Sequence, residues 1–527
     1  MFTRSLTCFL LLLFGGDCLA ENISYSRPNI LVIISDNHST QYLHSSENLG
    51  IRVNPTPTLT KLAQTGYSHK LAYCSNSSSS KFFSYILGSD TISPNHDLSK
   101  DNSKLIGHHF NSLGYDTAFF GSWKGNLHPK QIGFQTSFQL EDPEIFFNPK
   151  IINNQDIFLF EGHTTDVITE QALHWIQQDH ERSKPFFIII SYQATKRPWM
   201  PPIRTINLYN DKWFDVPDSF FSDFTQRTPA NRYQRMNIAQ DLDLMNDLFL
   251  GTSTETDPSD QNPSILAKNI KSMNDEQRSA WWLSWKPQNE AFSRESKSEQ
   301  SNAVWKFQRY IKNYLRCLFA MDENVERLLN TLNSSTEEDF RLIYTSKKGN
   351  FCGEFGWFGS EWMYEPSSKI PLIVYDPLGT SKKNLDGQQI ISGKKIYQLI
   401  KNLVESHSTL GPTRSSKIKN ASSQNNFHYY TNDDFPGTYH VSPHHGLRKG
   451  HFKIIHYYPF NEWEFYNLND DPAEETNLFS NDSHQEIIKE YKSLLLNHAA
   501  SVKSHSLRTV FSESWKREQR APNRRSR

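Results

Sequence analysis

The chain has 527 residues, a length that corresponds to about three average domains or to one large α/β core with additions. Its 56 Lys and Arg residues nearly balance its 57 Asp and Glu residues, which gives a formal net charge of -1. This balance argues against a protein that binds nucleic acid through a positive field over its whole surface. The 35 Phe, 22 Tyr and 12 Trp residues supply ample core, which excludes disorder throughout.

The one long apolar run lies at the N-terminus and is typical of a secretory signal peptide. Arg4 supplies the positive charge, residues 8–14 the apolar segment, and Cys18-Leu19-Ala20 the small residues before a cleavage site. We therefore expect residues 1–20 to be a signal peptide and the mature chain to be secreted or periplasmic, with no membrane span. The same leader is compatible with a lysosomal enzyme. An alternative is a bacterial lipoprotein that carries its lipid on Cys18, which the preceding Asp17 fits poorly.

Cleavage after this leader would leave three cysteines, Cys74, Cys317 and Cys352. An odd number cannot pair fully, so the chain is not built on a disulfide framework. In a host that glycosylates, the N-x-S/T pattern predicts glycan acceptors. The candidates are Asn22, Asn37, Asn76, Asn333, Asn420 and Asn481.

Apolar runs that suit buried strands alternate with segments of helical periodicity. The strands are predicted at residues 30–34, 116–120, 186–191, 340–345 and 370–375, and the helices at 56–66, 165–178 and 310–332. This alternation predicts an α/β fold with a large, mostly parallel mixed sheet between helices. After about residue 437 the pattern changes, and residues 451–458 and 462–468 predict a smaller antiparallel sheet.

After the predicted signal peptide, these patterns divide the chain into three parts. Residues 21–410 form the predicted α/β core, with a polar, turn-rich insertion at about 250–302 that has some helix. Residues 411–505 form a predicted C-terminal α+β subdomain. We expect residues 506–527 to be a disordered basic tail, since the last twelve positions hold six Arg and Lys residues.

Six segments in chain order resemble the sulfatase family of the alkaline-phosphatase-like superfamily. Residues 353–365, for example, read GEFGWFGSEWMYE where the family has GEHGWFDKRWMYE. The other segments are 27–30, 56–59, 186–199, 310–324 and 462–472. The likeness is greatest to secreted glycan sulfatases of the N-acetylglucosamine-6-sulfatase and iduronate-2-sulfatase type. It implies an alkaline-phosphatase-like fold for residues 27 to about 480.

The resemblance also implies a nucleophile made from Cys or Ser, within a C/S-x-P-S-R motif, by conversion to formylglycine. Alignment without a gap places Ser79 at this position, and a single deletion would place Ser78 there. Lys81, Phe82 and Phe83 then stand where the family has Pro, Ser and Arg. These motif residues direct the conversion, so we expect Ser79 to remain an unmodified serine without an activating partner.

The family's divalent cation is held by two carboxylates after the first strand and by an Asp and an Asn, Gln or His after a late strand. Asp36 and Asn37 form the first pair here, whereas Lys347 and Lys348 replace the second. Ca²⁺ prefers several oxygen ligands. An ammonium about 4 Å away would repel it by roughly 8 kcal/mol at an effective dielectric constant near 20. We therefore expect no cofactor, with Ca²⁺ bound only if the site is functional after all. Alternatively, an ammonium pairs with Asp36 in place of the ion.

The other implied catalytic positions are altered too. Ser122 and Lys124 replace the family's K-x-H, and Lys196 replaces the histidine of its HRPW segment. Phe355 replaces the histidine of GEHG, and Ser360 the lysine that follows. The general acid, the leaving-group stabiliser and the sulfate clamp are therefore all changed, while the scaffold segments survive.

Three functions follow from these observations. The favoured one is a sulfatase-family protein that has lost hydrolysis and binds a sulfated glycan or a sulfate ion. The alternative is an active sulfatase with an atypical site, and the third is another hydrolase that uses Ser79 directly with a metal. In each case Asp36, Ser79, Lys124, Lys196 and Lys347 should meet at the carboxyl end of the sheet.

Overall fold

A computed structural model describes the part of the chain discussed below. The described residues are 27–43, 53–89, 102, 104–154, 156–225, 227–250, 264–294, 298–334, 339–376, 387–405 and 426–502. The predicted signal peptide, Cys18, Asn22, Asn420 and the basic tail lie outside them.

A nine-stranded sheet forms the centre of the molecule. From edge to edge its strands are β2 (Tyr67–Ser68), β12 (Leu372–Tyr375), β9 (Phe340–Ser346), β1 (Asn29–Ser35), β8 (Phe186–Ser191), β4 (Asp116–Gly121), β5 (Thr136–Leu140), β6 (Lys150–Asn153) and β7 (Asp156–Leu159). The five strands from β9 to β5 are parallel, and the outer strands are antiparallel. The predicted mostly parallel mixed sheet is confirmed.

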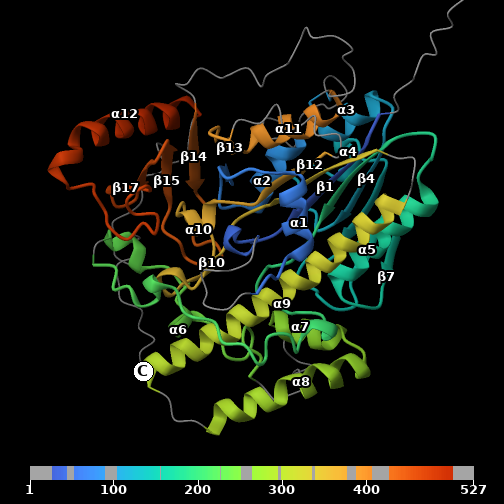
Figure 1. Cartoon of the computed structure of the whole chain (residues 1–527), viewed down its shortest axis with the longest axis horizontal. Coiled ribbons are helices and arrows are strands. Elements are labelled where there is room, and N and C mark those ends of the chain that lie inside the picture. The colour runs from blue at the N-terminus through green and yellow to red at the C-terminus, as the bar shows by residue number, and fades with distance from the viewer. Residues whose placement is uncertain are drawn as a thin grey trace, which may run out of the picture.

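Helices cover both faces of this sheet, which its apolar centre requires, since every residue of β1 is buried. Figure 1 shows one group on one side and a second group on the other. The first comprises α1 (Pro57–Thr65), α5 (Thr164–His174) and the long α9 (Glu299–Ser334). The second comprises α2 (Ser79–Leu87), α3 (Ile106–Ser112), α4 (Pro129–Ile132) and α11 (Lys394–Glu405). No helix in the described ranges is long and apolar enough to cross a membrane.

Helices also form part of the predicted insertion. After α6 (Ile238–Asp241), the chain forms α7 (Ile265–Ser272) and α8 (Asp275–Arg294), which lie beneath the sheet in Figure 1. They enclose a separate apolar cluster that includes Phe249, Trp281 and Trp285. The remaining elements are short: β3 (Ala72–Tyr73), β10 (Phe351–Cys352), β11 (Phe358–Gly359), α10 (Glu365–Ser368) and β13 (Ile391–Ser392).

A second, four-stranded sheet lies beside the first, at the left of Figure 1. It is fully antiparallel and consists of β14 (Phe427–Asn432), β15 (His444–Lys449), β16 (Phe452–Tyr457) and β17 (Glu462–Asn467). Helix α12 (Gln485–Ser501) packs on this sheet around its own apolar cluster. The smaller antiparallel sheet predicted near the C-terminus is confirmed.

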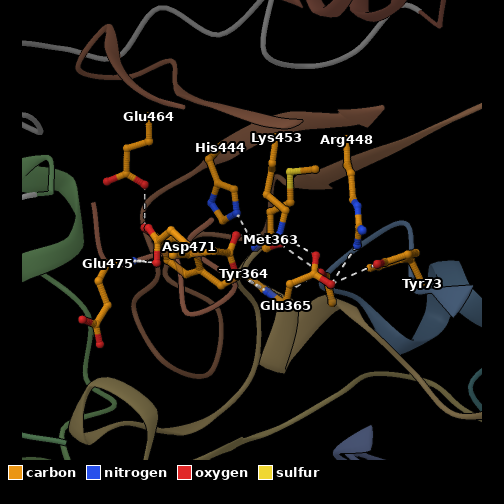
Figure 2. Close-up of polar contacts among 12 residues, drawn as sticks. Tyr73, Met363, Tyr364, Glu365, His444, Arg448, Lys453, Glu464, Asp471 and Glu475 are labelled. Carbon is orange, nitrogen blue, oxygen red and sulfur yellow. Dashed lines mark hydrogen bonds and ion pairs between the residues drawn. The ribbon is translucent and has the colours of Figure 1, made fainter. Parts of the chain in front are cut away.

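A buried network of charges joins the small sheet to the core (Figure 2). Lys453 of β16 lies 2.9 Å from Glu365, the first residue of α10, and 2.7 Å from Glu474. Glu365 also pairs with Arg448 of β15 at 2.8 Å and accepts a hydrogen bond from the Tyr73 hydroxyl. The small sheet is therefore held to the core by polar contacts as well as by apolar packing.

The structure also places the thiols and most candidate glycan acceptors. Cys74, Cys317 and Cys352 are buried free thiols. Asn333 and Asn481 are exposed, as glycan acceptors must be. Asn37 and Asn76 are buried, and their amide nitrogens donate hydrogen bonds to Ser360 and Thr431, so their predicted glycosylation does not fit the fold.

Candidate functional site

A cavity of about 620 Å³ opens at the carboxyl ends of the central parallel strands. Asp36 follows β1, Lys124 follows β4, Lys196 follows β8 and Lys348 follows β9, and all four line this cavity, here called the lysine pocket. Ser79, the first residue of α2, lies in the same wall. Four of the five residues expected to meet, Asp36, Ser79, Lys124 and Lys196, line this one cavity, because adjacent parallel strands end at one edge of the sheet. The fifth, Lys347, does not line the cavity and reaches it only through its contact with Asp36.

Asp36 forms part of the floor of the lysine pocket, and Lys347 is buried behind it without lining the pocket. Its ammonium nitrogen lies 3.4 Å from the Asp36 carboxylate and donates to the backbone oxygen of Tyr192 at 3.3 Å. Both side chains are buried, Lys347 completely. Burial lowers the pKa of Lys347 to about 8, although Asp36 acts to raise it. The second Asp36 oxygen, Oδ1, is buried and accepts no hydrogen bond from the described residues.

Three more lysines, Lys124, Lys196 and Lys348, are half-buried in the wall of the lysine pocket. Within the described ranges none of them has a carboxylate within 4.0 Å, so none forms a direct ion pair there. Burial lowers the pKa of Lys196, and the neighbouring charges of Lys124 and Lys348 lower it further, against Asp36 and Glu144. The pocket therefore holds three lysines without a carboxylate within 4.0 Å among the described residues, although acidic residues also line it: Asp36, Glu144, Asp247, Glu361 and Asp434.

A run of serines also lines the lysine pocket. Ser77 to Ser80 line the lysine pocket where α2 begins, and Ser78 is the N-cap residue of that helix. The first amides of a helix have no partners within the helix, which makes them donors toward an anion. In the described part of the chain, the Ser79 hydroxyl forms no hydrogen bond with a side chain that could act as a base. The geometry thus provides anion donors but no activated nucleophile.

Three residues that the resemblance places among the catalytic positions do not line the lysine pocket. Ser122 and Ser360 are buried, and Ser360 accepts a hydrogen bond from the Asn37 amide at 3.4 Å. Phe355 is buried in an aromatic cluster, with the Arg227 guanidinium 3.5 Å from its ring centre. These positions have become part of the core, so they supply neither a proton donor nor a sulfate ligand.

Several residues that line the lysine pocket were not predicted from the sequence. Arg197 lines the lysine pocket and binds Asp247 through two hydrogen bonds of 2.6 Å. Glu361 is buried in the wall, and burial raises its pKa although Lys348 acts to lower it. Glu144 pairs with Lys268 at 2.9 Å. The charge reversal at Glu361, where the family motif has Arg, was the one available signal in the sequence.

The side chains at the floor of the lysine pocket do not suit a divalent cation. The implied second pair of ligands is Lys347 and Lys348, and the Lys347 ammonium already lies against the Asp36 carboxylate. Among the residues that the structure describes, no three His, Cys, Asp or Glu side chains gather as a metal site would require. A hard cation would meet one carboxylate and a positive charge, the reverse of the oxygen cage it needs.

Comparison with known proteins decides the family. The profile of the sulfatase family matches residues 28–415, and that of the C-terminal part of N-sulphoglucosamine sulphohydrolase matches residues 353–501. The chain belongs to the sulfatase family. It is also 28% identical over 492 residues to an N-acetylglucosamine-6-O-sulfatase of Bacteroides thetaiotaomicron, with 89% of this chain and 86% of the relative covered.

Solved structures agree with this assignment. One is a complex of a protein with its substrate D-glucosamine-2-N,6-O-disulfate. It matches this sulfatase-family chain with a TM-score of 0.75 and 27% identity, covering 91% of this chain and 98% of that one. A phosphonate monoester hydrolase of Agrobacterium radiobacter matches with a TM-score of 0.52 and 15% identity over 93% of this chain and 99% of its own, which shows the shared fold alone.

Proposed function

We propose that this sulfatase-family chain is a secreted protein that binds a sulfated glycan in the lysine pocket and does not hydrolyse the sulfate ester. The observation that carries the proposal is the set of three half-buried lysines, Lys124, Lys196 and Lys348, that lack close counter-ions around the start of α2. Ammonium groups bind sulfate as point charges, and an anion would relieve their mutual repulsion.

The proposed absence of hydrolysis is supported by the residues around Ser79 and Asp36. Acyl, phosphoryl and sulfuryl transfers need a nucleophile that a base or a cation activates. Ser79 has no such base among the described residues, and Lys347 stands at the Asp36 carboxylate where a cation would be needed. Phe355 is an aromatic core residue that can neither donate nor accept a proton.

The sugar is proposed from the relatives. The curated relative named above is an N-acetylglucosamine-6-O-sulfatase, and the solved complex holds a glucosamine disulfate. Glucosamine 6-sulfate is therefore the first probe to use. Glu361 and Asp434 in the wall are acceptors that could meet sugar hydroxyl groups.

Calorimetric titration tests the proposal. We expect the wild type to bind glucosamine 6-sulfate and not glucosamine, with an affinity that falls as salt rises. Lys124→Ala and Lys196→Ala should each weaken binding about tenfold or more, because each removes a charged hydrogen-bond donor. Lys449→Ala is the control, since Lys449 lies on the small sheet and pairs with Glu490. Equal binding by the wild type and the pocket variants, or no binding by the wild type, would contradict the proposal.

A further inference from the structure

We propose that the Lys347 ammonium is a covalently tethered replacement for the divalent cation of the family, so that the lysine pocket holds its anionic ligand with no metal ion. The statement about the anion rests on the proposed function, whereas the statement about the cation does not. The residues present do not suit the divalent cation that the family resemblance implies.

The backbone places Lys347 beside the Asp36 carboxylate. Strands β1 and β9 are parallel neighbours with Ser35 opposite Ser346, so the next residue of each strand lies at the same edge. The Lys347 amide donates to the Ser35 backbone oxygen at 3.0 Å, which continues the pairing by one step. Both side chains therefore enter the same space below the pocket.

The surroundings of the Lys347 nitrogen are those of a bound cation. Two oxygen atoms lie near it, Asp36 Oδ2 at 3.4 Å and the Tyr192 backbone oxygen at 3.3 Å. The Phe83 ring adds a cation–π contact, with its centre 5.5 Å from the nitrogen. Because the side chain is fully buried, the ammonium is a fixed charge beside Asp36 and not a mobile surface charge.

The tethered charge explains how Asp36 persists in a pocket that binds anions. A buried carboxylate without a cation would repel a sulfate group and would itself be unstable. Lys347 neutralises it from below, while Lys124, Lys196 and Lys348 remain available to the ligand. A metal ion at the same carboxylate would have to approach the ammonium, and the like charges oppose that.

Titration with Ca²⁺ tests whether the Lys347 ammonium replaces the divalent cation. The wild type should bind no Ca²⁺, whereas the double variant Lys347→Asp/Lys348→Asn, which restores a carboxylate and an amide at the two positions, should bind it with a dissociation constant of roughly 10⁻⁵–10⁻³ M. Lys347→Met is the matched control, since it removes the charge without adding a ligand and should bind none. Circular dichroism verifies that each variant folds. Stoichiometric Ca²⁺ on the wild type, or none on a folded double variant, would overturn the inference.

Titration with glucosamine 6-sulfate tests whether the lysine pocket binds its anionic ligand without a metal ion. The affinity of the wild type should change less than twofold between buffers with Ca²⁺ and buffers with EDTA. An affinity that is lost in EDTA and restored by Ca²⁺ would overturn the tethered cation while leaving glycan binding intact. Failure to bind the sugar in either buffer would instead contradict the proposed function, and the Ca²⁺ titrations would still decide the role of Lys347.

Discussion

Replacement of Lys453 by methionine is expected to lower the free energy of unfolding by about 3–5 kcal/mol, the usual loss when one partner of a buried ion pair is removed. Lys453 is fully buried between Glu365 at 2.9 Å and Glu474 at 2.7 Å, and Figure 2 shows its contact with Glu365. Without the ammonium, two carboxylates would face each other in the interior. Burial already raises the pKa of Glu474, and Lys453 is the main group that opposes this. Denaturant titration at pH 7 measures the loss.

Two further variants identify the cause of that loss. Lys449→Met removes a lysine of the neighbouring strand whose partner Glu490 is exposed, and it should change stability by less than about 1 kcal/mol. Adding Glu474→Gln to Lys453→Met removes one of the two facing carboxylates and should recover part of the stability. If Lys453→Met unfolds within about 1 kcal/mol of the wild type, the network does not hold the small sheet to the core.

Acidification from pH 7 to pH 5 is expected to destabilise the protein strongly, because buried histidines stay neutral in the fold. Burial lowers the pKa of His428 to about 3, with Lys453 and Lys395 acting in the same direction. Below the unfolded value of 6.5 the unfolded chain takes up a proton that the folded chain excludes, so stability falls as pH falls from about 6.5 toward 3. At pH 5 this amounts to about 2 kcal/mol for one such histidine. Others with pKa values lowered by burial are His38, His163, His444 and His445.

His428→Phe isolates one of these contributions. The His428 ring stacks on Tyr73, and neither ring nitrogen has a hydrogen-bond partner among the described residues, so a phenyl ring can take its place. Denaturant titrations at pH 7 and pH 5 should show a loss on acidification that is smaller by about 2 kcal/mol in this variant than in the wild type. The exposed His451→Phe should leave the loss unchanged. Equal losses in His428→Phe and the wild type would contradict the assignment.

Strands of the sheet that are covered on both faces could be predicted from their continuous runs of apolar residues. The β-branched run at residues 30–34 lies within β1, which is buried along its whole length. The direction of β12 could not be predicted, since an apolar run reads the same in both directions, and it pairs antiparallel with β9. Strands β6 and β7 lie at one edge of the sheet. The apolar residues Ile157, Phe158 and Leu159 of β7 are exposed, so this strand lacks the burial that is typical of a core strand.

The sequence predicts only those residues of the site that follow a predicted strand. Asp36 and Lys347 directly follow β1 and β9, while Lys124 and Lys196 lie in the short segments after β4 and β8, so their meeting is a property of the parallel sheet. Glu144, Asp247 and Glu361 reach the lysine pocket from loops, and no local pattern shows where a loop returns. Ser122 and Ser360 illustrate the converse, because the resemblance places them among the catalytic positions while both are buried and do not line the pocket.

Release of sulfate is the most direct test of the central claim that this sulfatase-family chain binds without hydrolysis. Purified protein is incubated with glucosamine 6-sulfate, with and without Ca²⁺, and free sulfate is measured by ion chromatography. We predict no release above that of a Ser79→Ala variant prepared in the same way, because Ser79 has no activating group within the described residues and Lys347 stands at the Asp36 carboxylate. Sulfate release by the wild type that disappears in Ser79→Ala would contradict the account.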